Sequence, residues 1–189
     1  MLNPKPYEYV IDPACGSGGF LIASMNYVRE KYLKSDEQKQ DYAREYLYGI
    51  DFADETAKVS RALMLIAGDG RSHLFKLNSL DSREWQGEDA DKLHARHQLL
   101  QRLVKFKDYA EEEENKKNFK RFGFDVLITN PPFAGEIKDQ GLLRQYEFGR
   151  KRGKLVNKIE RHILFIERVL DMVKPGGRIA IVLPQGVLN

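Results

Sequence analysis

Short apolar runs alternate along this chain with longer segments in which apolar residues recur every three or four positions. The runs YVID, YLYGID, FDVLIT and RIAIVLP have the length and composition of buried strands, and the longer segments have the period of amphipathic helices. Strands that alternate with helices predict an α/β fold with a doubly wound, mainly parallel sheet. The predicted elements are strand 8–12, helix 18–33, strand 46–51, helix 53–66, strand 73–78, strand 123–129, helix 157–172 and strand 177–183.

A charge-rich insertion, at about residues 82–121, separates the third and fourth predicted strands. Five residues with aliphatic side chains recur at near-helical spacing before the run EEEENKKNFKR. These residues are Leu93, Leu100, Leu103, Val104 and Lys107. This pattern predicts one long amphipathic helix that ends in a solvated charged run. A surface helix packed on its own domain is the favoured interpretation, and a partner-binding arm is the alternative. His94 and His97 lack neighbouring ligand residues, so we predict surface histidines and no metal.

Composition and charge fit one soluble domain. The 189 residues are 42% hydrophobic, which is enough to fill a core, and the formal net charge of +3 is too small to indicate nucleic acid by itself. No run has the length of a membrane span, and no signal peptide opens the chain. Because Cys15 is the single cysteine, no intrachain disulfide is possible, which is consistent with a reducing cytoplasm.

A glycine-rich turn, DPACGSGG, follows the first predicted strand directly and leads into a helix. Gly16 and Gly18 let the backbone approach a ligand closely, and the free N–H groups of a helix N-terminus suit a carboxylate. Leu21 stands where a dinucleotide fingerprint requires its third glycine, and no Gly-Lys-Ser/Thr follows, which disfavours a pyrophosphate or P-loop site. The arrangement is therefore typical of a site for an adenosine-containing cofactor. A turn that only tightens the joint is the alternative.

The tetrapeptide Asn130, Pro131, Pro132 and Phe133 follows the strand FDVLIT. The Asn130 amide oxygen and the backbone carbonyl of Pro131 can each accept an N–H of a conjugated amino group, which directs the nitrogen lone pair at an incoming methyl group. The prolines stiffen the loop, and Phe133 can stack on a base. The alternative for this tetrapeptide alone is a strand-ending turn.

Taken together, VIDPACGSGGFLI and DVLITNPPF resemble motifs I and IV of the methyltransferases that form N6-methyladenine in DNA. They are most similar to those of the modification subunit of type I restriction-modification systems. The resemblance implies a Rossmann-like methyltransferase fold, S-adenosylmethionine as cofactor, Asn130 to Phe133 as catalytic residues, and double-stranded DNA with specificity and restriction subunits as partners. Asn-Pro-Pro-Phe also occurs in enzymes that act on RNA adenines or protein glutamine amides. Those targets, and a non-catalytic module that binds DNA or partner subunits, stay open.

The same resemblance implies which residues hold the cofactor. The residues that correspond to contacts with its methionine end are Asp12, Ala14, Cys15, Gly16, Ser17 and Gly18. Asp51 corresponds to the acceptor of the ribose hydroxyls, which agrees with the ability of a carboxylate to bind a vicinal diol. Phe52 corresponds to the apolar residue that packs on the cofactor adenine. Asp54 is expected to cap the following helix in place of Asp51.

Asn78 stands where the family more often has an acidic residue that binds the adenine amino group, and Asp69 and Asp81 are nearby alternatives. The family's complete sheet has seven strands, and its upstream motif X has no counterpart before Tyr9. The resemblance therefore implies that residues 1–189 form a partial catalytic domain of a larger, cytoplasmic subunit.

A basic run, GRKRGK, follows the Asn-Pro-Pro-Phe motif and contains Arg150, Lys151, Arg152 and Lys154. In a methyltransferase such a segment can hold phosphates near an extruded base. An ordinary basic surface loop is the alternative.

Overall fold

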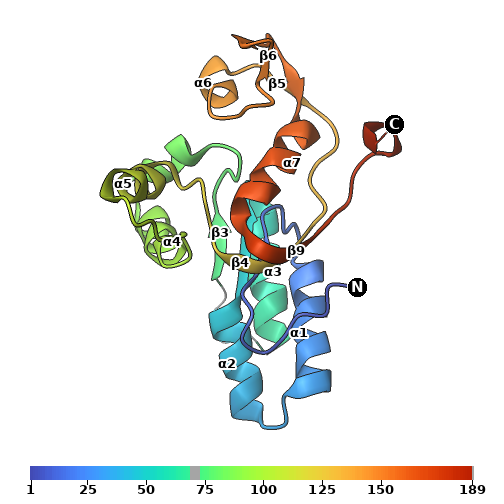
Figure 1. The fold of residues 1–189 in the computed structure, drawn as a ribbon. Coiled ribbons are helices and arrows are strands. Elements are labelled where there is room, and N and C mark those ends of the chain that lie inside the picture. The colour runs from blue at the N-terminus through green and yellow to red at the C-terminus, as the bar shows by residue number, and fades with distance from the viewer. Residues whose placement is uncertain (69–72, 189) are drawn as a thin grey trace.

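The central sheet confirms the predicted α/β architecture (Figure 1). A computed structural model of the chain describes residues 1–68 and 73–188. Within them one sheet has the strand order β3-β2-β1-β4-β9, and each neighbouring pair is parallel. Its strands are β1 (Val10–Asp12), β2 (Leu47–Asp51), β3 (His73–Lys76), β4 (Phe124–Thr129) and β9 (Val173–Ile181).

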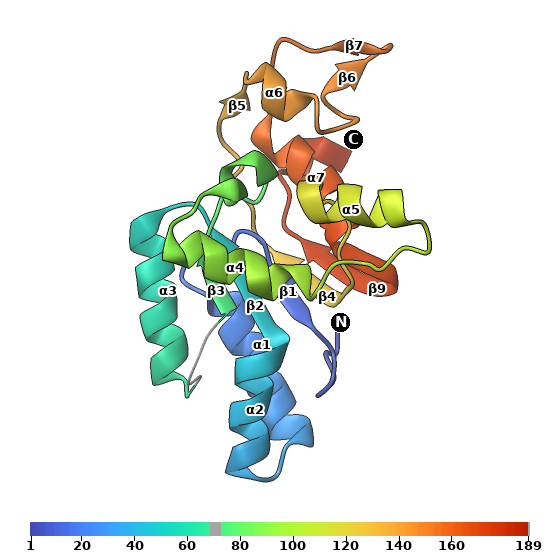
Figure 2. The same cartoon turned by 90° about the vertical axis from the view of Figure 1, so that its left-hand side faces the viewer.

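Helices cover both faces of this sheet, as a doubly wound fold requires. One face carries α1 (Gly19–Tyr32), α2 (Asp36–Tyr46) and α3 (Asp54–Ile66). The other face carries α4 (Ala90–Leu100) and α7 (Arg161–Met172), and α5 (Tyr109–Asn118) lies on that same side. Figure 2 shows α4 and α5 in front of the sheet and α1 behind it.

Buried residues alternate between two cores because successive strand residues point to opposite faces. Val10 and Val126 pack with the α1 side, whereas the next residues, Ile11 and Leu127, pack with the α7 side. At Gly49, in the middle of β2, a side chain would have to displace its neighbours. A Cβ atom there would lie 2.3 Å from Leu74 Cδ2 and 2.9 Å from Leu21 Cδ1.

The insertion between β3 and β4 is not the single long helix that the sequence predicts. It contains a 3-10 helix, η1 (Ser82–Gln86), then α4, which ends at Leu100, and then α5, whose first turn is capped by the Asp108 side chain. Leu103 pairs with Phe122 in an isolated bridge, so it lies in an extended segment. The predicted stripe is also wrong, because Leu93 and Leu100 are 47% and 42% exposed.

Other residues of the insertion reach the core. Ala95 and Leu99 are the buried residues of α4, and they pack in one cluster with Trp85, Phe119 and Phe122. The insertion therefore packs on its own domain. His94 and His97 are exposed, as predicted.

One whole helix, one helix start and one helix cap differ from the prediction. The helix α2 was not predicted, although Ser35 and Gln38 form a capping box at its start. The helix α7 begins at Arg161, four residues later than expected, because the preceding residues pair in a small sheet. Asp54 does not cap α3, whose N-cap is Ala53 without a side-chain bond; Asp54 instead forms ion pairs with lysines.

Residues 134–160, which we call the cap, lie beyond the carboxyl ends of the central strands, at the top of Figure 1. The cap contains β5 (Glu136–Ile137), α6 (Gln140–Leu143), β6 (Arg150–Lys151), β7 (Lys154–Leu155) and β8 (Ile159–Glu160). Leu142, Leu143 and Tyr146 pack with Leu164 and Phe165 of α7 in a third apolar cluster. In the described residues, no helix has both the length and the apolar character that a membrane span needs.

Candidate active site

The reversal of strand order positions the site. From β1 the chain continues to β2 on one side, whereas from β4 it continues to β9 on the other, so a crevice forms between β1 and β4 at their carboxyl ends. Ala14 follows β1 and Asn130 follows β4, and both line a cavity of about 500 Å³ at this edge. The volume is within the usual range for small-molecule sites.

Several of the predicted residues meet in this cavity. Those that line it are Ala14, Gly16, Asp51, Phe52, Asn78, Asn130 and Pro132. Those that lie outside its lining are Asp12, Cys15, Ser17, Gly18, Pro131 and Phe133. The structure thus brings the predicted cofactor and catalytic segments to one cavity, although not each of their residues faces it.

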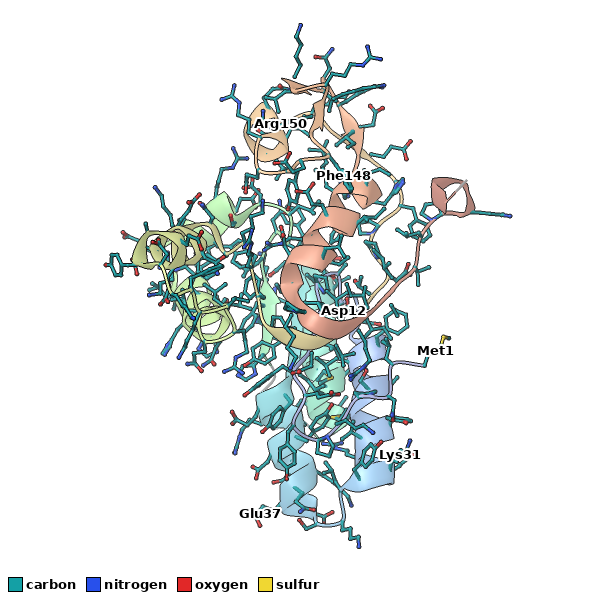
Figure 3. The ribbon with its side chains drawn as sticks, in the orientation of Figure 1. Met1, Asp12, Lys31, Glu37, Phe148 and Arg150 are labelled. Atoms are coloured by element: carbon teal, nitrogen blue, oxygen red, sulfur yellow. The ribbon has the colours of Figure 1, made fainter. Side chains whose placement is uncertain are left out.

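Asp12 is buried at the centre of the molecule, as Figure 3 shows, with 1% of its surface exposed. Its Oδ1 accepts hydrogen bonds from the Thr129 hydroxyl at 2.7 Å and the Ala14 backbone N–H at 3.0 Å. Burial raises the pKa of Asp12 to about 7. Asp12 therefore joins the ends of β1 and β4 and fixes the glycine turn, rather than lining the cavity itself.

Asp51 holds the glycine turn from the next strand. One carboxylate oxygen accepts the Gly16 N–H at 2.9 Å, and the other accepts the Ala53 N–H at 3.0 Å and the Thr56 hydroxyl at 2.6 Å. A carboxylate has about four acceptor positions, so these bonds leave one free. The Thr56 hydroxyl also lies 3.0 Å from the Ala53 carbonyl, so it can turn there and free a second position.

The remaining residues of the glycine turn differ in exposure. Cys15 is buried, and burial raises the pKa of its thiol, so it packs as a neutral group and is a poor nucleophile. Ser17 is exposed, and Gly18 is the left-handed N-cap of α1. Phe52 is 68% exposed at the cavity, so its ring offers apolar surface that the protein itself does not cover.

Asn78 is the better placed of the residues considered for the adenine amino group. It lines the cavity, and its amide oxygen accepts only the Leu80 N–H, at 3.2 Å, among the described residues. Asp81 is buried outside the cavity, and its carboxylate is occupied by Arg83 and Gln145. Asp69 lies outside the described residues.

The Asn130 side chain is exposed to the cavity, and it makes no hydrogen bond to the described part of the chain. Its acceptor oxygen is therefore available to a ligand. Pro131 is buried behind it, and Phe133 is 43% exposed beyond the cavity lining.

His162, which no sequence motif indicated, supports this loop from α7. It is buried, and its Nδ1 lies 3.2 Å from the Phe133 carbonyl oxygen. A carbonyl can only accept, so Nδ1 carries the hydrogen. The bond fixes the loop backbone three residues after Asn130.

The outer wall of the cavity was also missed from the sequence. It is formed by Ile137 and Leu142 of the cap and by Arg161 and Phe165 of α7. No motif marks these residues, because they reach the cavity only through the way the cap folds back on the sheet. Nowhere in the described residues do three His, Cys, Asp or Glu side chains gather as metal ligands would.

The lining fits S-adenosylmethionine. Gly16 has a φ of +51°, and a Cβ atom there would meet no atom within 4 Å, so the turn leaves open space beside its backbone. Asp51 offers carboxylate acceptors for a diol, and Phe52 and Leu80 offer apolar surface for a flat ring. Polar acceptors at one end and apolar walls match a nucleoside.

Comparison with known proteins agrees with this geometry. The Type I restriction enzyme EcoEI methylase subunit of Escherichia coli is 24% identical over 187 residues, which cover 99% of this chain and 30% of that protein. The Type II restriction enzyme and methyltransferase RM.BcgI of Heyndrickxia coagulans is 23% identical over 183 residues, which cover 96% of this chain and 21% of that protein. The crystal structure of the Type I restriction enzyme EcoKI M protein aligns with a TM-score of 0.60 at 20% identity, covering 99% of this chain and 32% of that one.

The chain thus spans about a fifth to a third of the length of these relatives. At 20% identity the solved structure supports the fold alone. A family model described as N-6 DNA Methylase matches residues 1–189. Because this match extends over the whole sequence, the chain belongs to the N-6 DNA methylase family.

Proposed function

We propose that this chain carries the catalytic site of an S-adenosylmethionine-dependent methyltransferase that modifies the N6 amino group of adenine in DNA. The observation that carries the proposal is the shared cavity, in which Asp51 and Phe52 face Asn130 and Pro132. A module that only binds DNA or partner subunits does not require a nucleoside-sized cavity lined by the Asn130 amide, which has no hydrogen-bond partner among the described residues.

The cofactor, when bound, supplies an electrophilic methyl group on its sulfonium. Asp51 would hold the ribose hydroxyls, and the Thr56 hydroxyl can donate to the Ala53 carbonyl in place of Asp51, which would leave the carboxylate a second acceptor position. Asn78 would accept a hydrogen bond from the adenine amino group, and Phe52 would pack on the adenine ring. Asp12 contributes indirectly, since it fixes the backbone of Ala14.

Asn130 acts on the target base. The amino group of adenine is a weak nucleophile because its lone pair is delocalised into the ring. The Asn130 amide oxygen and the Pro131 carbonyl each accept one of its N–H groups, which favours a pyramidal nitrogen with a localised lone pair. Phe133 stacks on the extruded base, a contact worth roughly 1–3 kcal/mol. His162 positions Asn130 and Phe133 through its hydrogen bond to the Phe133 carbonyl.

The family description favours DNA over RNA adenine or protein glutamine as the target. Two of the relatives are named as a methylase subunit and an M protein of type I restriction enzymes. We therefore propose specificity and restriction subunits as partners. Because the proposed substrate is genomic DNA, we propose the cytoplasm as the location.

Asn130→Ala in the complete methyltransferase tests the proposal. Loss of the amide should lower methyl transfer to duplex DNA by at least about 100-fold, the effect of removing one preorganised hydrogen-bonding group from an active site. Cofactor binding, measured by calorimetry, should change less than about two-fold, because Asn130 contacts no part of the proposed cofactor anchor. Asn26→Ala, an exposed asparagine on α1, is the matched control and should leave both unchanged.

Transfer by Asn130→Ala at the wild-type rate would refute the activation scheme. If the wild-type enzyme methylated RNA or a glutamine-containing protein in preference to DNA, the cofactor site would stand and the DNA target would be wrong.

A further inference from the structure

The β6–β7 hairpin in the cap is more basic than any function assigned so far requires. Arg150, Lys151, Arg152 and Lys154 lie within it, all are exposed, and none forms an ion pair with the described residues. The segment from residue 141 to 159 contains one acidic residue, Glu147. In Figure 2 the hairpin projects from the cap at the end of the molecule farthest from α2.

Cross-strand pairing in the hairpin is unfavourable on its own. Lys151 lies directly opposite Lys154 in the antiparallel ladder. Like charges at directly opposed positions destabilise a strand pair. A strand pair of this kind gains stability when an anion approaches both ammonium groups.

The turn of the hairpin carries a second local cost. Arg152 and Gly153 have φ values of +52° and +76°, as a two-residue hairpin turn of this hand requires. The first of these positions favours asparagine, aspartate or glycine. An arginine held in this left-handed conformation destabilises the backbone by about 1–2 kcal/mol. The chain nevertheless presents a guanidinium at the tip, where no described residue pairs with it.

The base of the hairpin is held firmly to the domain. The two Glu167 carboxylate oxygens of α7 accept the backbone N–H groups of Glu147 and Phe148, both at 2.9 Å. Leu155 of β7 packs against the apolar cluster that includes Leu142, and Leu142 lines the active-site cavity. The cations therefore extend from the outer wall of the cavity, and Figure 3 shows Phe148 and Arg150 on this part of the molecule.

Together, these observations point to a polyanionic partner that lies beside the cavity. We propose that the β6–β7 hairpin, residues 150–155, binds backbone phosphates of the DNA duplex that carries the target base. This inference rests on the proposed function. Each phosphate that a cation neutralises releases condensed counterions, so binding falls with salt by about 0.9 in log–log slope per contact.

The test measures binding of a fluorescent DNA duplex to the complete methyltransferase by anisotropy between about 50 and 200 mM salt. The double variant Lys151→Gln/Lys154→Gln should reduce the slope by about 2 and weaken binding at least about ten-fold at the lowest salt. The matched control is Lys138→Gln/Lys158→Gln. It removes the same charge from the same cap, but both lysines are paired with Glu136.

Arg152→Asn separates binding from folding. Asparagine suits the left-handed turn position, so the free energy of unfolding should stay equal or rise, while duplex affinity falls. A purely structural hairpin would move both quantities in the same direction.

If the double variant and the control gave equal slopes on a wild-type enzyme that binds DNA, the hairpin assignment would be wrong and the proposed function would stand. If the wild-type enzyme bound no DNA but bound RNA through these lysines, the DNA target itself would fall. Calorimetry with the cofactor alone should give the same affinity for wild type and double variant, and a loss there would show that the substitutions damage the cavity.

Discussion

Two charge-rich connections leave the central sheet of this chain, and they use their charges in opposite ways. Between residues 105 and 121 there are six basic and five acidic residues, and Lys116 of α5 pairs with Glu112 at 2.8 Å and Glu113 at 2.9 Å. Between residues 144 and 158 there are six basic residues and one acidic residue, and the hairpin cations have no partner in the described chain. The positive and negative charges of the first connection nearly balance. The second connection keeps a large net positive charge.

The apolar residues of the two connections differ in the same sense. The whole connection from β3 to β4, which includes the first charged run, contributes Trp85, Phe119 and Phe122 to the main core, where they join Val169 and Met172 of α7. The second one contributes the cap, whose cluster closes the cavity over Asn130. A charged connection that contains both signs of charge and buries aromatic residues is thus a structural part of the domain. A connection that is rich in cations and lacks acidic partners points instead to an anionic binding partner.

Trp85 anchors the connection between β3 and β4 in the main core. Trp85→Ala removes a fully buried indole that packs 5.1 Å from the Phe119 ring and donates a 2.7 Å hydrogen bond to the Asn78 carbonyl. We expect the free energy of unfolding to fall by about 3–5 kcal/mol in urea titrations. Tyr109→Ala, at an exposed aromatic of α5, is the control and should cost less than about 0.5 kcal/mol. A loss below about 1 kcal/mol for Trp85→Ala would instead favour a dispensable, partner-binding arm.

Asp12 differs from the charged residues of both connections, because it is neither paired with a cation nor exposed. Its folded pKa of about 7 lies above the ordinary aspartate value of 3.8, so the folded chain retains a proton that the unfolded chain releases. This group is most favourable to folding below about pH 4. Its contribution then falls as pH rises toward 7, by up to about 1.4 kcal/mol per pH unit.

Asp12→Asn should remove that dependence. Both hydrogen bonds go to Oδ1, which an asparagine retains. From pH 5 to pH 8, the free energy of unfolding should fall by roughly 2.5 kcal/mol more in wild type than in the variant, as measured by urea titration at each pH. Asp91→Asn, at an exposed position of α4, should keep the wild-type dependence. Equal slopes for wild type and Asp12→Asn would show that Asp12 is ionised throughout.

The smallest effect is expected at α5. Lys116→Gln removes two exposed i,i+3 and i,i+4 ion pairs, each worth about 0.2–0.5 kcal/mol in a helix. The loss of unfolding free energy should disappear near 1 M salt, where screening is nearly complete. Lys117→Gln, the next residue and one without an ion pair in the described chain, should cost nothing measurable at either salt concentration. A loss above about 1 kcal/mol at Lys116 would mean that the pairs support the core and not merely the helix surface.

The sequence predicted the strands well because each parallel strand is an uninterrupted apolar run that ends at a recognisable turn. The positions of Asp51 and Asn130 at strand ends were enough to place both at one edge of the sheet. The signal for α2 was also present, in the Ser35 and Gln38 capping box, but the helix is polar and lacks a strong apolar period. Prediction from periodicity therefore passed over it.

Tertiary contacts explain what the sequence could not predict. The stripe of Leu93 and Leu100 suggested a buried face, yet α4 buries Ala95 and Leu99 in the main core instead. The side of α4 that faces the sheet is set by how the helix docks, which the local pattern does not contain. Phe165 reaches the cavity, and His162 the Phe133 carbonyl, only through the docking of α7. No local pattern contains that information.

Gly49 belongs to no motif, but it limits which residue types β2 can carry at this position. A methyl group at this position would also come within 3.1 Å of Cys15 Sγ, in the glycine turn. Substitution by alanine would therefore require the side chains of Leu74, Leu21 and Cys15 to shift. Cys15 lies in the same turn as Gly16, whose N–H donates to Asp51. Exposed lysines outside the hairpin can therefore vary with little effect on this turn, whereas a larger residue at position 49 displaces the side chains around it.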